Sequence, residues 1–314
     1  MAPPAKPTYK NSVGTQMWGP SGVPVWTTPT IDPKRNRLYI GTGENTSSPP
    51  TDLSDAIVAL DLDTGSIIWS FQATKGDAFN MACRRGPSCP PEQGPDFDFG
   101  ATPVLATLTN GDEVLVAGQK SGMVYSLDPD DGSLHWQVEL SQGTALGGVH
   151  WNISVVDQMV IVPISDPPIR RDFTPRPGVY AVSLANGRLI WSHDAVRDCE
   201  VTNWRESRPR NDNLWPDCYF AHGYSAAVTA TEDLVFAATL DGKAVVLSRD
   251  NGEPLWQFDT VRAFEDTVNG VEAHGGTIDN AGIQVADDLV MVQSGYRLHG
   301  QMPGNAVLMF GLDD

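Results

Sequence analysis

A fourfold internal repeat is the feature that most restricts how this chain can fold. Four segments of one design recur along its 314 residues: ALDLDTGSIIW (59–69), SLDPDDGSLHW (126–136), AVSLANGRLIW (181–191) and VLSRDNGEPLW (246–256). Each leaves an apolar run, passes through a polar turn with glycine, and closes on tryptophan. Such a turn is typical of a tight hairpin whose glycine takes positive φ. The repeat therefore predicts a series of equivalent β-units.

Further strand-like runs precede each repeated turn, such as RLYIGTG (37–43) and EVLVAGQ (113–119). A fifth unit starts with AGIQVA (281–286), and the chain ends before its fourth strand. Four-stranded units at this period are typical of β-propeller blades. We therefore predict an all-β propeller of about five blades, four complete and the last partial, as one domain or propeller fragment over 1–314.

The repeated tryptophans are expected to anchor neighbouring blades. A blade cannot bury both of its faces alone, so a large ring at the same place in each unit suits the contact between two sheets. We expect each indole N–H to be satisfied by backbone. The tryptophans with this predicted role are Trp69, Trp136, Trp191 and Trp256.

Charge and cysteine placement narrow the class of protein. The formal net charge of −18 argues against binding to nucleic acid, and no apolar run approaches the length of a membrane span. All four cysteines lie in two insertions, residues 75–98 and 194–222, without zinc-site spacing. We expect loop-closing disulfides within the sets Cys83/Cys89 and Cys199/Cys218 and hence an oxidising compartment. The start MAPPAKPTYK has no signal region, so we expect an exported protein with this start to be a processed form.

Several stretches carry a resemblance to a known family. They include VWTTPTIDPKRNRLYIGTGEN (25–45), GPDFDFGATPVL (94–105), AGQKSGMVYSLDPDDG (117–132) and ALGGVHW (145–151). Together with the Trp repeat, they resemble quinoprotein alcohol dehydrogenases, eight-bladed propellers that hold pyrroloquinoline quinone and usually calcium. Within that family the chain is most similar to polyvinyl alcohol dehydrogenases. The resemblance implies that only the C-terminal five-eighths are present, with the family's N-terminal blades absent.

The resemblance also implies roles for residues that would touch the quinone. Trp26 matches the tryptophan that stacks on one face of the quinone. Lys120, in GQKSG, matches the basic residue that contacts the quinone carbonyl oxygens, where its charge would stabilise the reduced ring. His150, in GGVHW, lies where a polar contact to the cofactor is expected.

Acids and amides supply the remaining implied roles. Asp77, eight residues beyond Trp69, falls at the position of the catalytic aspartate, which takes the hydroxyl proton of the alcohol. Glu44 follows GTG, where many relatives carry an asparagine ligand for calcium. Calcium accepts carboxylate and amide oxygens alike, so Glu44 and Asp77 are the predicted ligands, with Asn45 as the alternative to Glu44.

Three functions remain open at this point. The resemblance implies oxidation of secondary or polymer-borne alcohols with pyrroloquinoline quinone and calcium, electrons passing to a cytochrome c, in the periplasm or outside the cell. A second copy of the chain is one way to complete the ring. One alternative is a truncated, non-catalytic propeller that acts as an interaction scaffold, although that would leave Asp77 and Lys120 without a purpose. The other is a calcium-dependent propeller lactonase or hydrolase, with candidate inward acids Glu44, Asp55, Asp77 and Asp98.

Overall fold

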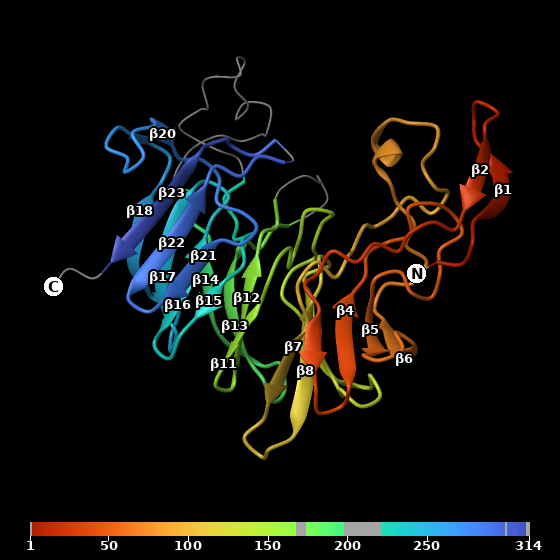
Figure 1. Cartoon of the computed structure of the whole chain (residues 1–314), viewed down its shortest axis with the longest axis horizontal. Coiled ribbons are helices and arrows are strands. Elements are labelled where there is room, and N and C mark those ends of the chain that lie inside the picture. Colours follow the sequence, from red (N-terminus) through yellow and green to blue (C-terminus); the bar gives the residue numbers. More distant parts are fainter. Residues whose placement is uncertain (1, 168–173, 198–220, 299, 312–314) are drawn as a thin grey trace. The chain divides into compact units, whose positions relative to one another are not determined.

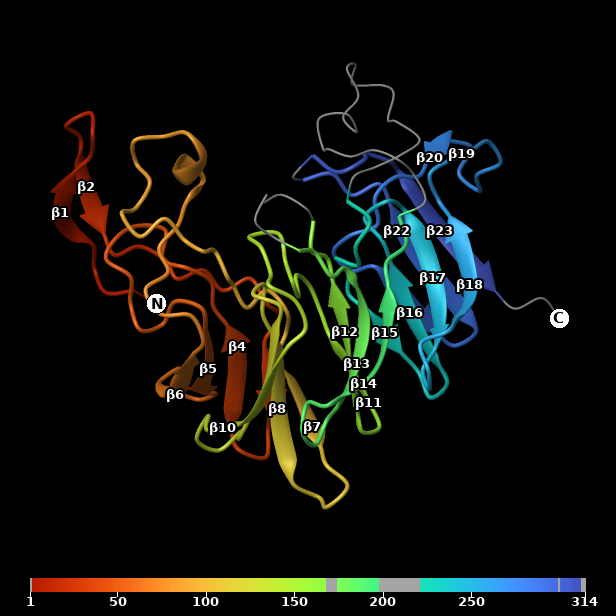
Figure 2. The ribbon, with the colours of Figure 1, turned by 180° about the vertical axis from the view of Figure 1, so that it is seen from behind.

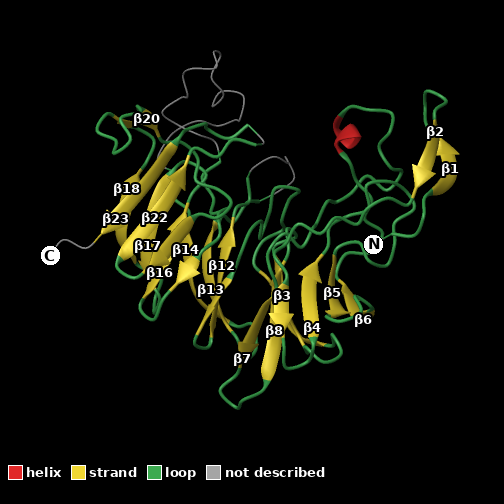
Figure 3. Ribbon diagram, viewed as in Figure 1, coloured by secondary structure: helices red, strands yellow, loops and turns green. Residues whose placement is uncertain are grey.

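The computed structural model describes residues 2–167, 174–197, 221–298 and 300–311. Within them the chain is built from strands and contains one short 3-10 helix, η1 (Met81–Arg84) (Figures 1 and 3). It divides into two compact units. The first unit is Met1–Glu139 with Gly143–Gly147, and the second is Leu140–Gln142 with Gly148–Asp314.

The first unit holds a hairpin and two four-stranded antiparallel sheets. The hairpin pairs β1 (Lys6–Lys10) with β2 (Gln16–Gly19). One sheet has the order β3 (Thr30–Asp32), β4 (Arg37–Gly41), β5 (Ala56–Asp61) and β6 (Ile67–Gln72). The next has the order β7 (Val104–Thr107), β8 (Glu113–Gly118), β9 (Met123–Leu127) and β10 (Leu134–Glu139). Strands β3 and β7 are in contact, so the two sheets meet at their first strands.

The second unit continues the same pattern. Its complete sheets are β11 (Ser154–Val156), β12 (Met159–Ile164), β13 (Gly178–Ser183) and β14 (Leu189–Asp194), then β15 (Thr229–Ala230), β16 (Leu234–Ala238), β17 (Lys243–Ser248) and β18 (Pro254–Asp259). A short pair, β19 (Ala263–Phe264) and β20 (Ala273–His274), precedes the last sheet of β21 (Ile283–Ala286), β22 (Leu289–Ser294) and β23 (Ala306–Gly311). The described residues thus confirm the prediction of four complete blades and one partial blade.

Burial along each sheet explains why the sequence pattern changes from strand to strand. Strand β5 lies between β4 and β6 and is buried from Ala56 to Ala59, and its Ile57 and Ala59 pack in one core cluster with residues of the next sheet. Strand β6, at the edge of the same sheet, exposes Ile67 and Ile68 and buries mainly its tryptophan. The second unit repeats this in β14, where Leu189 and Ile190 are exposed around a buried Trp191. Trp69 and Trp191 are therefore the inward anchors of otherwise exposed strands.

The docking of Trp69 and Trp191 confirms the predicted anchor role for these two residues. The Nε1–H of Trp69 donates to the Pro129 carbonyl at 3.2 Å, and that of Trp191 donates to the Arg249 carbonyl at 2.6 Å. Each acceptor belongs to the repeated turn of the next sheet. A Cβ placed on the turn glycine, Gly132 or Gly252, would lie 2.5 Å from the ring of the docking Trp. Glycine is required there by close approach as well as by positive φ.

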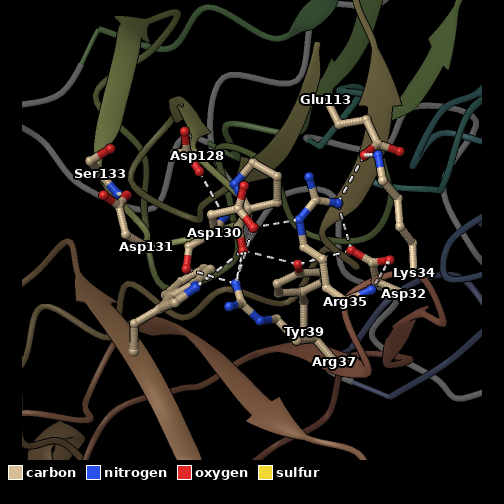
Figure 4. Close-up of polar contacts among 12 residues, drawn as sticks. Asp32, Lys34, Arg35, Arg37, Tyr39, Glu113, Asp128, Asp130, Asp131 and Ser133 are labelled. Carbon is tan, nitrogen blue, oxygen red and sulfur yellow. Dashed lines mark hydrogen bonds and ion pairs between the residues drawn. The ribbon is translucent and has the colours of Figure 1, made fainter. Parts of the chain in front are cut away.

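Charged side chains surround the first of these docking contacts (Figure 4). Arg35 reaches Asp32, Glu113 and Asp130, at 2.8–2.9 Å in each case. The hydroxyl of Tyr39 donates to the same Pro129 carbonyl that accepts from the indole of Trp69. Hydrogen bonds and ion pairs therefore join the two neighbouring sheets at the turn that carries Gly132.

Trp256 in β18 differs from these two anchors. Its side chain is 39% exposed, and its ring meets Phe310 of β23 edge-on, with centroids 5.1 Å apart. It packs on an aromatic side chain of the last sheet, whereas Trp69 and Trp191 pack on a glycine turn. For Trp136, half-buried in β10, the anchor role stays a prediction.

The structure tests the disulfide predicted in one of the two insertions but not the one predicted in the other. Residues 75–98 carry η1 and a disulfide between Cys83 and Cys89, which confirms that predicted pair. Cys199 and Cys218 lie outside the described residues.

The single propeller over 1–314 stays a prediction. Among the described residues, no helix is long and apolar enough to span a membrane.

Candidate functional site

Loops at one end of the first-unit sheets bring acids from distant parts of the sequence together. Strands β4, β6 and β8 end at this edge, whereas β5 and β7 begin there, because neighbouring strands are antiparallel. Glu44 follows β4, Asp55 precedes β5, and Asp77 follows β6. Asp98 precedes β7, and Lys120 follows β8. Figure 2 shows these strands from behind, with the loop that carries η1 above them.

Lys120 is the cation at the centre of this site. Its ammonium lies 2.6 Å from Asp98 Oδ2 and 3.1 Å from Asp96 Oδ1, and the residue is only 6% exposed. Burial lowers the pKa of Lys120, but the charges of Asp98 and Asp96 more than offset it, so its pKa lies above the ordinary value. The ammonium also lies 5.3 Å from the centroid of the Trp26 ring. The structure therefore brings together Trp26 and Lys120, two of the three predicted cofactor contacts.

Three carboxyl groups form what we call the acidic cluster: Glu44, Asp96 and Asp98. One oxygen from each lies within 4.8 Å of the others, a spacing that could hold a metal ion. Burial, with the hydrogen bond and charge of Asp98, raises the pKa of Glu44 to about 9. Burial also raises the pKa of Asp96 to about 7, although Lys120 opposes this shift. Burial acts the same way on Asp98, but Lys120 outweighs it and holds the pKa of Asp98 below its ordinary value.

The GTG motif has a direct role in forming this cluster. A Cβ on Gly43 would lie 2.6 Å from Asp98 Oδ1, so only glycine allows the carboxylate to come so close. The next backbone N–H, that of Glu44, donates to the same oxygen at 3.1 Å. Asn45, the alternative ligand, uses its amide oxygen to accept from the Thr51 N–H at 2.6 Å. Of the two alternatives, Glu44 is the one whose side chain belongs to the cluster.

Asp77 lies behind the acidic cluster and holds the segment that leads into it. The residue is fully buried, and its Oδ2 accepts from the backbone N–H groups of Asp96 at 2.8 Å and Phe97 at 3.1 Å. Among the residues that the structure describes, no hydrogen bond of regular geometry reaches Asp77 Oδ1 or the carboxylate oxygens of the fully buried Asp55, and these two acids interact with each other. Burial and the charge of Asp77 raise the pKa of Asp55 to about 10. The predicted roles of Asp77 as catalytic base and calcium ligand stay predictions.

His150 lies in the second unit, in a different hydrogen-bonded arrangement. Its Nδ1 is 2.9 Å from the Ser225 hydroxyl, which is 2.7 Å from Asp279 Oδ1. The neighbouring Trp151 donates its Nε1–H to the same carboxylate oxygen at 2.7 Å. We refer to Asp279, Ser225, His150 and Trp151 as the Asp279 network. The role of His150 as a cofactor contact stays a prediction.

Sequence reasoning missed part of both arrangements. Asp96 was not singled out, although DFD places two acids two residues apart directly before a strand. Asp98 was named only for the hydrolase alternative. Ser225 and Asp279 gave no local signal, because 54 and 75 residues separate the hydrogen-bonded pairs that involve them.

Proteins of known sequence or structure are similar to this chain over nearly its whole length. Residues 3–147 match the family model described as glucose/ethanol/alcohol dehydrogenase, beta-propeller domain. Residues 175–305 match a model described as outer membrane protein assembly factor BamB. A polyvinylalcohol dehydrogenase of Pseudomonas sp. is 38% identical over 98% of this chain and 47% of its own length. Another, from Sphingopyxis sp. (strain 113P3), is 34% identical over 93% of this chain and 43% of its own length.

Solved structures support the same fold. The quinohemoprotein alcohol dehydrogenase ADHIIG of Pseudomonas putida HK5 superposes with a TM-score of 0.61 at 16% identity, covering 91% of this chain and 48% of that one. The quinohemoprotein alcohol dehydrogenase of Comamonas testosteroni gives a TM-score of 0.58 at 17% identity, covering 93% and 48%. The chain thus spans about half the length of the curated relatives that it matches.

Proposed function

Because this chain is similar to polyvinylalcohol dehydrogenases over nearly its whole length, we propose that it serves the oxidation of secondary or polymer-borne alcohols with pyrroloquinoline quinone and calcium. The observation that carries this proposal is the acidic cluster with Lys120 and Trp26 beside it. Its relatives named polyvinylalcohol dehydrogenase motivate the polymeric substrate.

The acidic cluster fits a calcium ion on chemical grounds. Three buried or half-buried carboxyl groups lie close together, and two of them have pKa values raised to about 9 and about 7. Burial is the main cause of these shifts and repulsion between the charged forms adds to it, so a cation at this place would favour ionisation of all three. Calcium prefers oxygen ligands of this kind. Glu44, Asp96 and Asp98 are the residues that would hold it.

Trp26 and Lys120 fit the quinone. A flat aromatic ring suits stacking against a planar cofactor, and the ammonium held near it suits contact with carbonyl oxygens that gain negative charge. The quinone, when bound, would supply the two-electron acceptor for the alcohol. Asp96 and Asp98 keep Lys120 charged, since they raise its pKa.

Two carboxylates are candidates for the group that takes the hydroxyl proton of the alcohol. Asp77 is the predicted one, but its Oδ2 is bonded to two backbone N–H groups and burial raises its pKa. Asp98 is held ionised by Lys120, since its pKa lies below the ordinary value, and it belongs to the acidic cluster. We therefore favour Asp98 as the base and assign Asp77 to holding the 96–98 segment.

Reconstitution tests this proposal. The protein is titrated with pyrroloquinoline quinone in the presence of calcium, followed by quinone fluorescence, and dye-linked oxidation of a secondary alcohol is then assayed. We expect binding in the micromolar range for the wild type and a large loss for Lys120→Met. The exposed Lys75→Met serves as the matched control. Calcium binding without any quinone binding would favour the hydrolase alternative, and binding of neither would favour the scaffold.

Partners and compartment belong to the same proposal. The Cys83–Cys89 disulfide is consistent with a periplasmic or secreted protein, because disulfides persist in oxidising compartments. A cytochrome c is the proposed electron acceptor. A second copy of the chain, which would complete the propeller, is testable by light scattering with and without quinone.

A further inference from the structure

A pocket of about 680 Å³ lies beside β6, the edge strand of the first sheet (Figure 1). Residues 50–52, from the loop between β4 and β5, line it together with residues 70–72, Lys75 and Gly76. All of them belong to the first unit. We call this cavity the Gln72 pocket. Its volume is that of a typical ligand-binding pocket and far exceeds what one small alcohol would fill.

Gln72 holds the loop side of this pocket in place. Its side-chain Nε2 donates to the Thr51 carbonyl at 3.0 Å and to the Ser54 carbonyl at 3.1 Å. Thr51 in turn donates its backbone N–H and its hydroxyl to Asn45 Oδ1, at 2.6 Å and 3.1 Å. Hydrogen bonds within the protein therefore fix the loop wall of the pocket before any ligand binds.

The residue type at position 72 differs from that in the other repeats. The edge strands that begin at the four repeated tryptophans read WSFQ (69–72), WQVE (136–139), WSHD (191–194) and WQFD (256–259). Three of them have an acid at the fourth place, where the first has an amide. An ionised carboxylate has no proton to donate to the two loop carbonyls, so the loop wall depends on the amide. Because Nε2 is used there, the group that Gln72 can offer a ligand is its Oε1, an acceptor.

The lining residues favour an uncharged ligand that carries hydroxyl groups along an apolar chain. Pro50 and Phe71 are half-buried and supply apolar surface, whereas Ser70 is exposed and supplies a hydroxyl. Asp52 and Lys75, both exposed, carry opposite charges, so the pair favours neither an anion nor a cation. The net charge of −18 of the whole chain further disfavours an anion.

The pocket lies next to segments that lead to the acidic cluster. Asn45, which accepts both hydrogen bonds from Thr51, directly follows Glu44. On the other side of the pocket, Gly76 directly precedes Asp77. A ligand in the pocket is therefore held beside the loops that form the site. A second place of binding benefits a ligand in which the reacting group is repeated many times.

We propose that the Gln72 pocket is a binding subsite for a hydroxyl-bearing polymer chain, separate from the acidic cluster at which the reacting hydroxyl binds. The inference rests on the proposed function, in which the substrate is a secondary or polymer-borne alcohol. One part of the polymer occupies the pocket, which raises the effective concentration of its other hydroxyl groups near the cluster. The pocket thus lowers KM for polymers, whereas a single small alcohol has no second part to place in it.

Binding of oligomeric vinyl alcohol to the protein without added quinone tests the pocket alone. We expect isothermal titration to detect binding of this oligomer. Polyethylene glycol of the same length has no hydroxyl along its chain and should bind at least about tenfold more weakly. Equal binding of the two polymers would overturn the recognition of hydroxyl groups, and no binding of the vinyl alcohol oligomer would overturn the subsite.

A variant that fills the pocket supplies the second test. Ser70→Trp places a bulky ring at the lining, so we expect it to bind the oligomer about tenfold more weakly. Ser192→Trp is the matched control, because Ser192 is exposed and follows Trp191 in β14 as Ser70 follows Trp69 in β6. Equal affinities of the wild type and Ser70→Trp would contradict the proposal.

A variant of nearly the same shape tests the loop wall. Gln72→Glu introduces an acid, as in the other three repeats, and removes the donor to the Thr51 and Ser54 carbonyls. We expect it to weaken oligomer binding about tenfold as well. Gln137→Glu, at an exposed position of β10, adds the same charge and should leave binding unchanged. Equal losses in Gln72→Glu and Gln137→Glu would assign the effect to charge and overturn the role of the amide.

Turnover separates this inference from the proposed function. In the reconstituted protein we expect Ser70→Trp to raise KM for oligomeric vinyl alcohol about tenfold at unchanged kcat, and to change neither constant for propan-2-ol. Equal effects on both alcohols would overturn the subsite. A wild type that binds the oligomer but no quinone would overturn the proposed function and leave the subsite standing. A wild type that oxidises propan-2-ol but binds no oligomer would overturn the subsite alone.

Discussion

The acidic cluster of the first unit and the Asp279 network of the second unit place buried acids in opposite circumstances. In the acidic cluster of the first unit, Glu44 and Asp96 lie close to Asp98, and burial and like charge raise their pKa values to about 9 and about 7. In the second unit, the single carboxylate of Asp279 is surrounded by hydrogen-bond donors. The Asp279 network is satisfied by the protein itself, whereas the acidic cluster would gain from a cation. Only the first arrangement has the electrostatics of a metal site.

Replacement of the cluster's base is the largest expected effect. If Asp98 takes the hydroxyl proton, Asp98→Asn should lower kcat by about 100-fold or more with quinone still bound. Asp77→Asn should then cost less than about tenfold, or roughly 1.4 kcal/mol of barrier. Dye-linked turnover of the reconstituted variants, with Asp96→Asn in the same series, measures both. The reverse order would restore Asp77 as the base.

The contact between a docking Trp and a turn glycine is the same in both units, so its loss should cost the same stability in each. The buried acids are then the difference between the two units. Gly132→Ala and Gly252→Ala each force a Cβ to within 2.5 Å of a tryptophan ring at positive φ. We expect each to lower the free energy of unfolding by about 3 kcal/mol, as for other overpacked or strained sites. Gly65→Ala has a similar φ of 70° but nothing within 4 Å, so it should cost only about 1 kcal/mol. Urea unfolding gives all three values, and equal losses would contradict the docking account.

Most of the pH dependence of stability should come from the first unit. The folded-state pKa values of Glu44 and Asp96 lie above their ordinary values of 4.5 and 3.8, so the folded form binds protons more tightly than the unfolded form. Their contribution to stability is complete below about pH 4 and is lost as the pH rises through about 7 and about 9. We expect the free energy of unfolding without calcium to fall by several kcal/mol from pH 5 to pH 9.

Calcium provides the control for that prediction. Saturating calcium should flatten the pH profile of the wild type, because the ion favours the ionised carboxylates. Glu44→Gln should reduce both the slope without calcium and the effect of calcium. A profile that is unchanged by Glu44→Gln would place the titrating groups elsewhere.

The ion pairs around the first docked turn should give the smallest effects (Figure 4). Arg35 is 13% exposed and bonds three carboxylates, so Arg35→Ala should cost about 1 kcal/mol of unfolding free energy. Lys34 also reaches Glu113 but is 70% exposed, so Lys34→Ala should change stability by less than about 0.5 kcal/mol. Chemical denaturation at low and high salt measures both, and a larger effect for Lys34 would contradict this ranking.

Local pattern was enough to predict the scaffold. The repeated turn and tryptophan predict the four-stranded sheets and the anchors Trp69 and Trp191, because hairpin turns and apolar runs are local properties. The motif that ends in Glu44 and the turn that carries Lys120 follow regular strands, so the fold could bring them together. The short spacing of Cys83 and Cys89 likewise predicted their disulfide.

Contacts made by irregular loops and distant residues could not be predicted. The insertion 75–98 leaves after β6 and returns before β7, and its return path decides that Asp98 meets Lys120 while Asp77 supports the backbone. The Asp279 network joins three sequence-distant loops through side-chain hydrogen bonds. The pattern of apolar and polar residues in the sequence does not predict such contacts, because each depends on the tertiary path of the chain.

Calcium titration of the Glu44→Gln variant tests the central claim most directly. Isothermal titration in the presence of pyrroloquinoline quinone should give one calcium ion per wild-type chain. We expect Glu44→Gln to bind it at least about tenfold more weakly, with the buried Asp166→Asn of the second unit, whose pKa burial raises to about 6, as the matched control that leaves binding unchanged. Calcium binding that is the same in wild type, Glu44→Gln and Asp166→Asn would contradict the assignment of the acidic cluster as the metal site.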